Sequence, residues 1–390
     1  MQQGVRRMFS GAWLEEKLKQ GIREGCFSSA SAAFGVREHV LARASAGEAP
    51  EPRGTPDCYL SAAVPDGTRG QAGFTCGGML AEPESGFWTV LLPGRADPAR
   101  ESSALSAFRR ALHAEAWKIF SSPLSGEDLY RMLEIPEEVS ALYSRLDREA
   151  APFADADLVR RLLTRSEWAD AVKELETRIG QDPAHLRLLW EELRIVRARW
   201  PEWMKAGIPE EIFRDTMRFA TRYLLDDMKA YGRYGFNAGW WFPRQMAMEL
   251  FRLGSLEFEL LPHPEGRRIS IHIPSDASLA PEAVDDSLSR FRAFAAEYFP
   301  EWERAPFFCD SWLLSPALED LLPPSSRILA FRRRFRVLSV DPESMGAVSW
   351  VFPGYREPSA DLPEETSLQR AMKAFLLAGG KPGWADGIME

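Results

Sequence analysis

The sequence predicts an α+β or α/β protein in three parts: a small N-terminal α+β region (residues 1–122), a helical domain (123–250) and a mixed-sheet C-terminal domain (251–390). Three observations support this fold class. The first part is rich in Gly, Ala, Ser and Pro, with short β-prone runs. Apolar residues recur every three or four positions in the second. In the third, strand-like alternation is interleaved with helical periodicity.

Composition limits the function classes. The chain has 390 residues, 45% of them hydrophobic, which is enough for two or three domains with real cores. A disordered or fibrous chain is excluded. The net charge of -9 leaves no basic surface for a phosphate backbone, so we expect no nucleic-acid partner.

The cysteines bear on metal binding, and the N-terminal residues bear on where in the cell the protein is found. The four cysteines include no C-x-x-C pair and no His cluster at ligand spacing, so we expect free thiols and no metal. Charges interrupt residues 1–20 before a signal-peptide core forms, and no apolar run reaches about 18 residues. We therefore expect a soluble, cytoplasmic protein with no membrane partner.

The N-terminal region is expected to hold short strands. They are predicted at residues 31–36, 40–44, 58–64 and 87–92. Prolines and glycines predict a loop over residues 46–56.

The helical domain is predicted from spaced leucines. Leu158 and Leu162 share one helix face, as do Leu186, Leu189 and Leu193. The latter helix is expected to end at Trp200-Pro201, and Pro209 is expected to begin the next.

The C-terminal domain is predicted to begin with a β-hairpin, because residues 255–261 and 268–273 both alternate apolar and polar around a turn. Further elements follow in α/β order. They are a helix at 281–299, a strand at 307–314, a helix at 325–335, strands at 336–340 and 347–352, and a last helix from Thr366. Thr366 and Gln369 form a capping box, and Gly379 ends that helix.

Familiar catalytic motifs are absent. The sequence contains no G-x-S-x-G, S-x-x-K, H-E-x-x-H, G-x-x-x-x-G-K-[ST] or G-x-G-x-x-G. Residues 14–47, a helix followed by two short strands, resemble the opening of β-lactamase-like serine hydrolases. Without the nucleophile motif, a remnant hydrolase is a minor hypothesis for this region.

Five stretches from residue 233 onward carry a stronger resemblance. They read RYGFNAGWWFPRQ (233–245), LFRLGSLEFEL (250–260), ISIHIPSDASL (269–279), CDSWLLSPAL (309–318) and LPEETSLQRAMK (362–373). From about residue 125 to the C-terminus, the chain resembles a bacterial acyltransferase family that joins a helical N-acyltransferase N-terminal domain to a GNAT-like C-terminal domain.

The resemblance implies transfer of an acyl group from acetyl-CoA or another acyl-CoA to a small-molecule or peptide amine. It places the pantetheine against the strand that contains Ile271 and Ile273. The pyrophosphate would lie at the turn of Ser275, Ala277 and Ser278, before the helix at residue 281. It also implies that the next strand, at 307–314, splays away.

Two departures from the family pattern weaken this assignment. GNAT proteins usually carry Arg/Gln-x-x-Gly-x-Gly/Ala at this turn, whereas residues 275–280 read SDASLA, without glycine and with Asp276. The helix at 328–335 also lacks the tyrosine that often protonates the leaving thiolate. The alternative function is therefore a non-catalytic GNAT-like binding module.

Attack by an amine needs a base, for which Glu257, Glu259 and His272 are the candidates, with Asp310 as a further carboxylate. Alternation puts both glutamates on one face of a strand. The competing interpretation is that this face is wetted by solvent and that His272 is a structural histidine.

Three other features have a functional and a structural interpretation. Arg244, beside Trp240 and Trp241, either binds a phosphate or carboxylate or belongs to a cluster that fixes the helices on the sheet. Arg332 and its neighbours either steer a phosphate or form a solvated helix face. Cys309 is expected to be a buried structural thiol.

Overall fold

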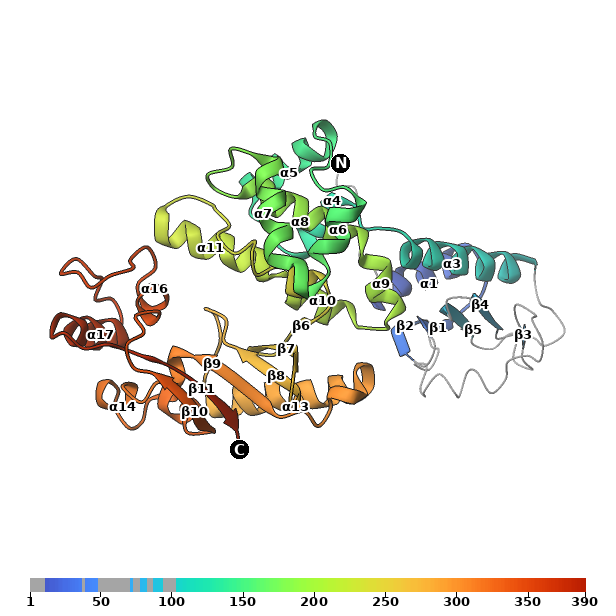
Figure 1. The fold of residues 1–390 in the computed structure, drawn as a ribbon. Coiled ribbons are helices and arrows are strands. Elements are labelled where there is room, and N and C mark those ends of the chain that lie inside the picture. The colour runs from blue at the N-terminus through green and yellow to red at the C-terminus, as the bar shows by residue number, and fades with distance from the viewer. Residues whose placement is uncertain (1–10, 37–38, 48–70, 73–77, 83–86, 94–102) are drawn as a thin grey trace. The chain divides into compact units, whose positions relative to one another are not determined.

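The computed structural model describes residues 11–36, 39–47, 71–72, 78–82, 87–93 and 103–390 (Figure 1). The chain forms two compact units. One comprises Met1–Ser125 with Val196–Phe213, and the other Gly126–Ile195 with Arg214–Glu390.

The N-terminal unit contains an antiparallel five-stranded sheet in the order β2-β1-β5-β4-β3. Its strands are β1 (Ala30–Val36), β2 (His39–Ala46), β3 (Gln71–Ala72), β4 (Gly78–Glu82) and β5 (Phe87–Pro93). The flanking helices are α1 (Gly11–Arg23) and α3 (Ser103–Ser121). Phe87 packs on Phe120 of α3, with ring centroids 4.6 Å apart. The structure contains the strands expected near 31–36, 40–44 and 87–92, whereas the one expected at 58–64 lies outside the described residues.

Short helices form the middle of the chain, as the leucine spacing predicts. They are α4 (Gly126–Met132), α5 (Glu137–Glu149), α6 (Ala156–Leu162), η1 (Arg165–Glu167), α7 (Trp168–Ile179), α8 (Leu186–Ala198), α9 (Trp200–Lys205), α10 (Glu210–Met217), α11 (Phe219–Tyr231) and α12 (Pro243–Met246). Leu158, Leu162, Leu189 and Leu193 are fully buried, which confirms the predicted faces. No helix in the described part of the chain is long and apolar enough to cross a membrane.

The C-terminal sheet has six strands in the order β10-β11-β9-β8-β7-β6. They are β6 (Leu250–Leu253), β7 (Leu256–His263), β8 (Gly266–His272), β9 (Phe307–Ser311), β10 (Phe335–Asp341) and β11 (Trp384–Met389). The predicted hairpin is confirmed, because β7 and β8 pair antiparallel from Glu257↔His272 to His263↔Gly266. The amphipathic helix is also confirmed as α13 (Pro281–Tyr298), whose Phe291 stacks on Phe258 with centroids 4.6 Å apart.

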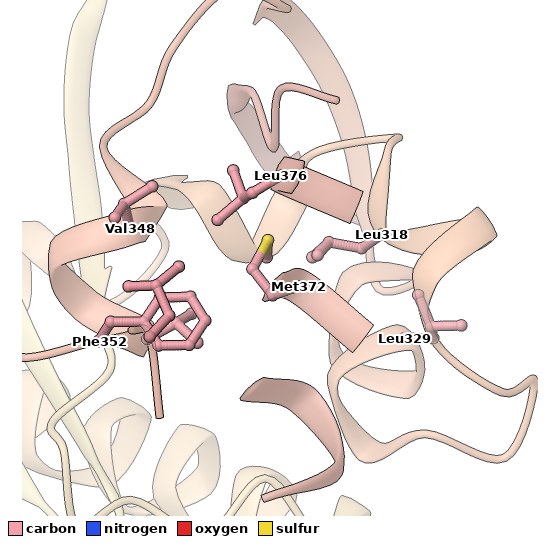
Figure 2. Close-up of a cluster of buried hydrophobic side chains, with 8 residues drawn as sticks. Leu318, Leu329, Val348, Phe352, Met372 and Leu376 are labelled. Atoms are coloured by element: carbon pink, nitrogen blue, oxygen red, sulfur yellow. The ribbon is translucent and has the colours of Figure 1, made fainter. Parts of the chain in front are cut away.

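The strand prediction for residues 347–352 is wrong, because Ala347–Val351 form helix α16. Val348 and Phe352 lie four residues apart and join a buried apolar cluster (Figure 2). There they accompany Met372 and Leu376 of α17 (Ser367–Leu377) and Leu318 of α14 (Leu318–Leu321). A strand would send two neighbouring apolar side chains to opposite sides, whereas helix α16 and the residue that caps it bury Val348, Val351 and Phe352 together.

Three element boundaries also differ from the prediction. The strand at 307–314 ends at Ser311, and Trp312–Leu314 form the 3₁₀ turn η3, which the Ser311 hydroxyl caps by accepting from the N–H of Leu313. The helix at 325–335 is only α15 (Arg327–Arg332), and Phe335 already belongs to β10. A further 3₁₀ turn, η2 (Pro300–Trp302), follows α13. The capping box of Thr366 and Gln369 is confirmed.

Candidate active site

The parallel pair of strands at the centre of the C-terminal sheet separates after two residues. β8 and β9 pair only at Ile269↔Phe307 and Ser270↔Phe308, although β8 continues to His272 and β9 to Ser311. Beyond Ser270 the ladder between these two described strands ends. This is the place where the resemblance implied that the next strand splays away and that pantetheine binds.

The two predicted carboxylates lie next to this separation and are not wetted by solvent. Glu257 and Glu259 are only 3% and 4% exposed. They share one face of β7, while Phe258 faces α13, so the alternation in the sequence predicted the facing correctly. Because a buried carboxylate needs compensating charge, each glutamate has an arginine partner from the helical region.

Glu259 is the centre of a buried charge cluster. Nη1 of Arg165 lies 2.6 Å from its Oε1, and Nε of Arg244 lies 3.5 Å from the same oxygen. The other oxygen, Oε2, lies 3.0 Å from Nε2 of His272. Burial alone would raise the pKa of Glu259, but the hydrogen bond with His272 and the charges of His272, Arg244 and Arg165 together lower it to about 2. Glu259 is therefore a fixed negative charge, which makes it unsuited to accept a proton near neutral pH.

Glu257 is held in a second ion pair. Arg222 of α11 donates from Nη2 to its Oε1 over 2.7 Å, and both side chains are at least nine-tenths buried. The guanidinium of Arg222 also lies 5.3 Å from the ring centre of Phe219. This enclosed pair makes Glu257 a poor candidate for a base that must meet a substrate.

His272 is the most accessible of the three predicted bases. It is the last residue of β8, and 23% of its side chain is exposed. Its ring and that of Trp241 form an edge-to-face pair, with centroids 4.8 Å apart. When Nε2 carries the proton and donates to Glu259, Nδ1 has a free lone pair, and no described residue hydrogen-bonds to it.

Arg244 and the tryptophans connect the helices to this histidine. The Arg244 guanidinium lies 3.9 Å from the ring centre of Trp241 and 5.2 Å from that of Trp168. Burial lowers the pKa of Arg244 from its usual value. Its side chain contacts Trp241, Trp168 and Glu259 and donates to the carbonyl oxygens of Trp240 and Trp241, which favours the structural interpretation. Trp240, in contrast, is 60% exposed.

The residues of the predicted phosphate-binding turn form hydrogen bonds with other residues of the protein. Ser275 donates to Asp226 over 2.7 Å, the Ala277 N–H bonds to Pro274 O over 3.0 Å, and the Ser278 hydroxyl accepts from Ala280 N at 3.4 Å. Ile271 is buried and pairs with Phe258, and Ile273 follows the end of β8.

Two arginines lie near the carboxylate of Asp276 in this turn. Arg252 donates to it over 2.8 Å, and Arg222 lies 3.9 Å away. These arginines offset the negative charge that the sequence places beside the expected pyrophosphate.

Sequence reasoning missed the arginines that organise this site. Arg165 precedes Glu259 by 94 residues, and Arg222 precedes Glu257 by 35. No local spacing connects such pairs, so only the fold reveals them. The prediction for Cys309 is confirmed: the thiol is fully buried, and burial raises its pKa well above its usual value.

Two family models match consecutive parts of the chain. The N-acyltransferase N-terminal domain matches residues 126–248, and the GNAT-like C-terminal domain matches residues 250–389. The chain belongs to the acyltransferase family that joins these two domains. No curated protein matches the sequence of this family member.

Solved structures resemble this acyltransferase family member over most of its length. One is an acyltransferase in complex with decanoyl-CoA and teicoplanin, with 25% identity and a TM-score of 0.55, covering 74% of this chain and 95% of that one. Another is an acyltransferase in complex with CoA and 10C-teicoplanin, with 25% identity and a TM-score of 0.50, covering 68% and 99%. A mutant acyltransferase in complex with octanoyl-CoA, at 24% identity and a TM-score of 0.55, covers 75% and 96% and shares the fold.

Proposed function

We propose that this protein transfers an acyl group from acyl-CoA to an amine and that His272 is the base. The observation that carries the proposal is the 3.0 Å contact between Nε2 of His272 and Glu259 at the point where β8 and β9 separate. A buried carboxylate that fixes one ring nitrogen leaves the other to accept a proton.

The reaction follows from this arrangement. The acceptor nitrogen attacks the thioester carbonyl carbon, and Nδ1 of His272 takes the proton that the nitrogen loses. The C–S bond then breaks, and the protonated imidazole returns this proton to the departing thiolate. Glu259, which Arg165 and Arg244 hold ionised, stabilises the imidazolium between the two steps. This proton relay does not need the tyrosine whose absence the sequence shows.

A medium-chain thioester is the donor to test first. The similar acyltransferase structures hold decanoyl-CoA or CoA with 10C-teicoplanin. The turn of Ser275, Ala277 and Ser278 lacks glycine, so we expect the acyl chain and pantetheine to contribute more to binding than the pyrophosphate. Affinity should therefore rise from acetyl-CoA to decanoyl-CoA, as titration calorimetry would show.

The base is tested with His272→Ala. With decanoyl-CoA as donor and teicoplanin as amine, kcat should fall about 10²- to 10⁴-fold, while the Kd for decanoyl-CoA stays within about twofold. Thiol release and the mass of the acylated product report turnover. The matched control is His263→Ala on the same hairpin, which should keep kcat.

Two results would contradict the proposal. Unchanged kcat in His272→Ala would remove this residue from the chemistry. A wild-type protein that neither binds acyl-CoA nor releases thiol with any amine would favour the non-catalytic binding module.

A further inference from the structure

The two arginines that neutralise Glu259 contact the same one of its oxygens. Nη1 of Arg165 lies 2.6 Å from Oε1, and Nε of Arg244 lies 3.5 Å from it. The other oxygen, Oε2, lies 3.0 Å from Nε2 of His272. A guanidinium and a carboxylate often pair through two parallel hydrogen bonds, which would occupy both oxygens. The other partners of each guanidinium explain why Oε2 is left to His272.

Arg244 is held by its aromatic and main-chain neighbours. Its Nη1 donates to the carbonyl oxygens of Trp240 and Trp241 over 3.5 and 3.4 Å. Its guanidinium also lies 3.9 Å from the ring centre of Trp241 and 5.2 Å from that of Trp168. These contacts fix the guanidinium, so Nε is the nitrogen that meets Glu259.

Arg165 has a second carboxylate, Glu249, at its other terminal nitrogen. Nη2 of Arg165 donates to the carbonyl oxygen of Leu260 over 2.8 Å and forms an ion pair with Oε2 of Glu249. A terminal guanidinium nitrogen carries two hydrogens. Leu260 and Glu249 account for both of them, so none is left for the second oxygen of Glu259.

The main chain fixes Glu249 for this contact. Its N–H bonds to the carbonyl oxygen of Arg244 over 3.0 Å, and its own carbonyl oxygen accepts from the N–H of Leu260 over 2.8 Å. Burial raises the pKa of Glu249, and the charge and hydrogen bond of Arg165 oppose this rise. The two side chains therefore depend on each other: the arginine favours the charged carboxylate, and the carboxylate occupies Nη2.

We infer that Glu249 is a positioning residue, which restricts Arg165 to one oxygen of Glu259 and so reserves the other for His272. This inference rests on the proposed role of His272 as the base and adds a residue that acts on it through two others. Loss of Glu249 frees one hydrogen of Nη2, and Arg165 then turns toward a doubly bonded pair with Glu259. Oε2 is withdrawn from His272, whose ring loses the bond that orients it.

The bond between Glu259 and His272 can be observed without turnover. In ¹⁵N-labelled protein, an imidazole N–H held by a carboxylate exchanges slowly with water and gives its own proton signal. His272→Ala identifies this signal among the five histidines. The signal should be present in the wild type and lost in Glu249→Ala. In Glu249→Gln it should only weaken, because the amide oxygen still accepts one hydrogen bond from Nη2.

The matched control removes another glutamate–arginine pair from the same domain. Glu265, in the turn between β7 and β8, pairs with Arg268 over 3.1 Å and is 80% exposed. Glu265→Ala should keep both the imidazole signal and kcat.

Activity gives a second test, in which one substitution should repair another. With the donor and amine used for His272→Ala, Glu249→Ala should lower kcat about 10- to 100-fold and leave the Kd for decanoyl-CoA within about twofold. Adding Arg165→Ala removes the arginine that competes for Oε2, so the double variant should regain about fivefold in kcat. A purely structural role predicts the opposite, because the second substitution also removes an ion pair with Glu259.

Three results would overturn the inference: no slowly exchanging imidazole signal in the wild type, an unchanged signal in Glu249→Ala, or a double variant less active than Glu249→Ala. The proposed function fails separately, because the signal needs no substrate. Unchanged kcat in His272→Ala, with the signal lost in Glu249→Ala, counts only against His272 as the base.

Discussion

Glu192 of α8 is a carboxyl group enclosed by protein and used by neither proposal. It is fully buried, and neither of its oxygens has a hydrogen-bond partner among the described residues. A Cβ added at Gly239 would lie 3.5 Å from its Oε2, which shows how closely the loop before Trp240 approaches it. Burial raises its pKa well above 4.5, so the folded protein holds it protonated where the unfolded chain does not.

Glu192→Gln should therefore raise the free energy of unfolding relative to the wild type, and the gain should increase as the pH rises. Above pH 4.5 the unfolded chain releases a proton that the folded state retains, so the wild type loses stability with increasing pH. Glutamine removes that loss, so the gain in the free energy of unfolding should be near zero at pH 4 and should grow as the pH rises toward 7. Urea unfolding at several pH values measures it. A gain independent of pH would contradict the explanation, and exposed Glu138→Gln should change stability by about 0.5 kcal/mol or less.

The contribution of Glu259 to stability changes with pH in the opposite direction. Its pKa is about 2 in the folded protein and near 4.5 when unfolded, so its contribution is complete above pH 4.5 and is lost as the pH falls toward 2. Glu259→Gln should cost about 3 kcal/mol at pH 6, because it removes the carboxylate that Arg244 contacts and one of the two that Arg165 contacts. The deficit relative to wild type should shrink between pH 4.5 and 2. Unfolding at pH 3 and pH 6 provides the test, and a constant deficit would refute this linkage.

At the scale of elements, the C-terminal helices depend on a small shared core. α14, α15, α16 and α17 each contribute buried side chains to one apolar cluster (Figure 2). Most of these helices are too short to be stable alone, so packing rather than propensity holds them.

Phe352→Ala should lower the free energy of unfolding more than a substitution of any exposed residue on α16. Phe352 is fully buried, and its removal leaves a cavity that costs about 3 to 5 kcal/mol. Trp350 is a matched control, because it lies in α16, which ends one residue before Phe352, and is 56% exposed. Trp350→Ala should cost about 0.5 kcal/mol or less by chemical denaturation. Equal costs for the two variants would rule out the buried role of Phe352.

At the scale of the whole molecule, the N-terminal unit is not confined to one continuous stretch. It includes Val196–Phe213, which contains α9, and α9 packs against α3. Leu124 N–H bonds to Arg197 O over 3.0 Å, and Trp200 and Trp203 are buried. The chain therefore returns to the first unit after α8.

Removal of residues 1–122 should thus expose apolar surface although both family domains remain. Loss of α3 uncovers the side of α9 on which it packs, so the shortened chain should melt at a lower temperature and bind more of the dye ANS. Thermal melts and dye fluorescence of both chains measure this. An unchanged melting temperature would show that α9 is stable without α3.

Part of the fold is encoded locally and was predictable. The alternation of residues 255–261 and 268–273 defines the hairpin, and the same period places Glu257 and Glu259 together on one face. The predicted helix at 281–299 needs only its apolar stripe, and the last helix has its capping box. Residues 347–352 show the limit of such reasoning, since a short apolar run satisfies both periods and its neighbours decide between them.

The sequence alone determined which residues carry usable chemistry: two glutamates in one strand, His272 in the next, and a turn without glycine. The tertiary structure decided which of these side chains are buried in ion pairs and which can reach a substrate. Arginines distant in sequence bind both glutamates, and β8 and β9 pair only at Ile269↔Phe307 and Ser270↔Phe308, two residues before His272. Side-chain alternation is a property of one strand. The identity of neighbouring strands, and of the arginines that reach them, depends on contacts between distant parts of the chain.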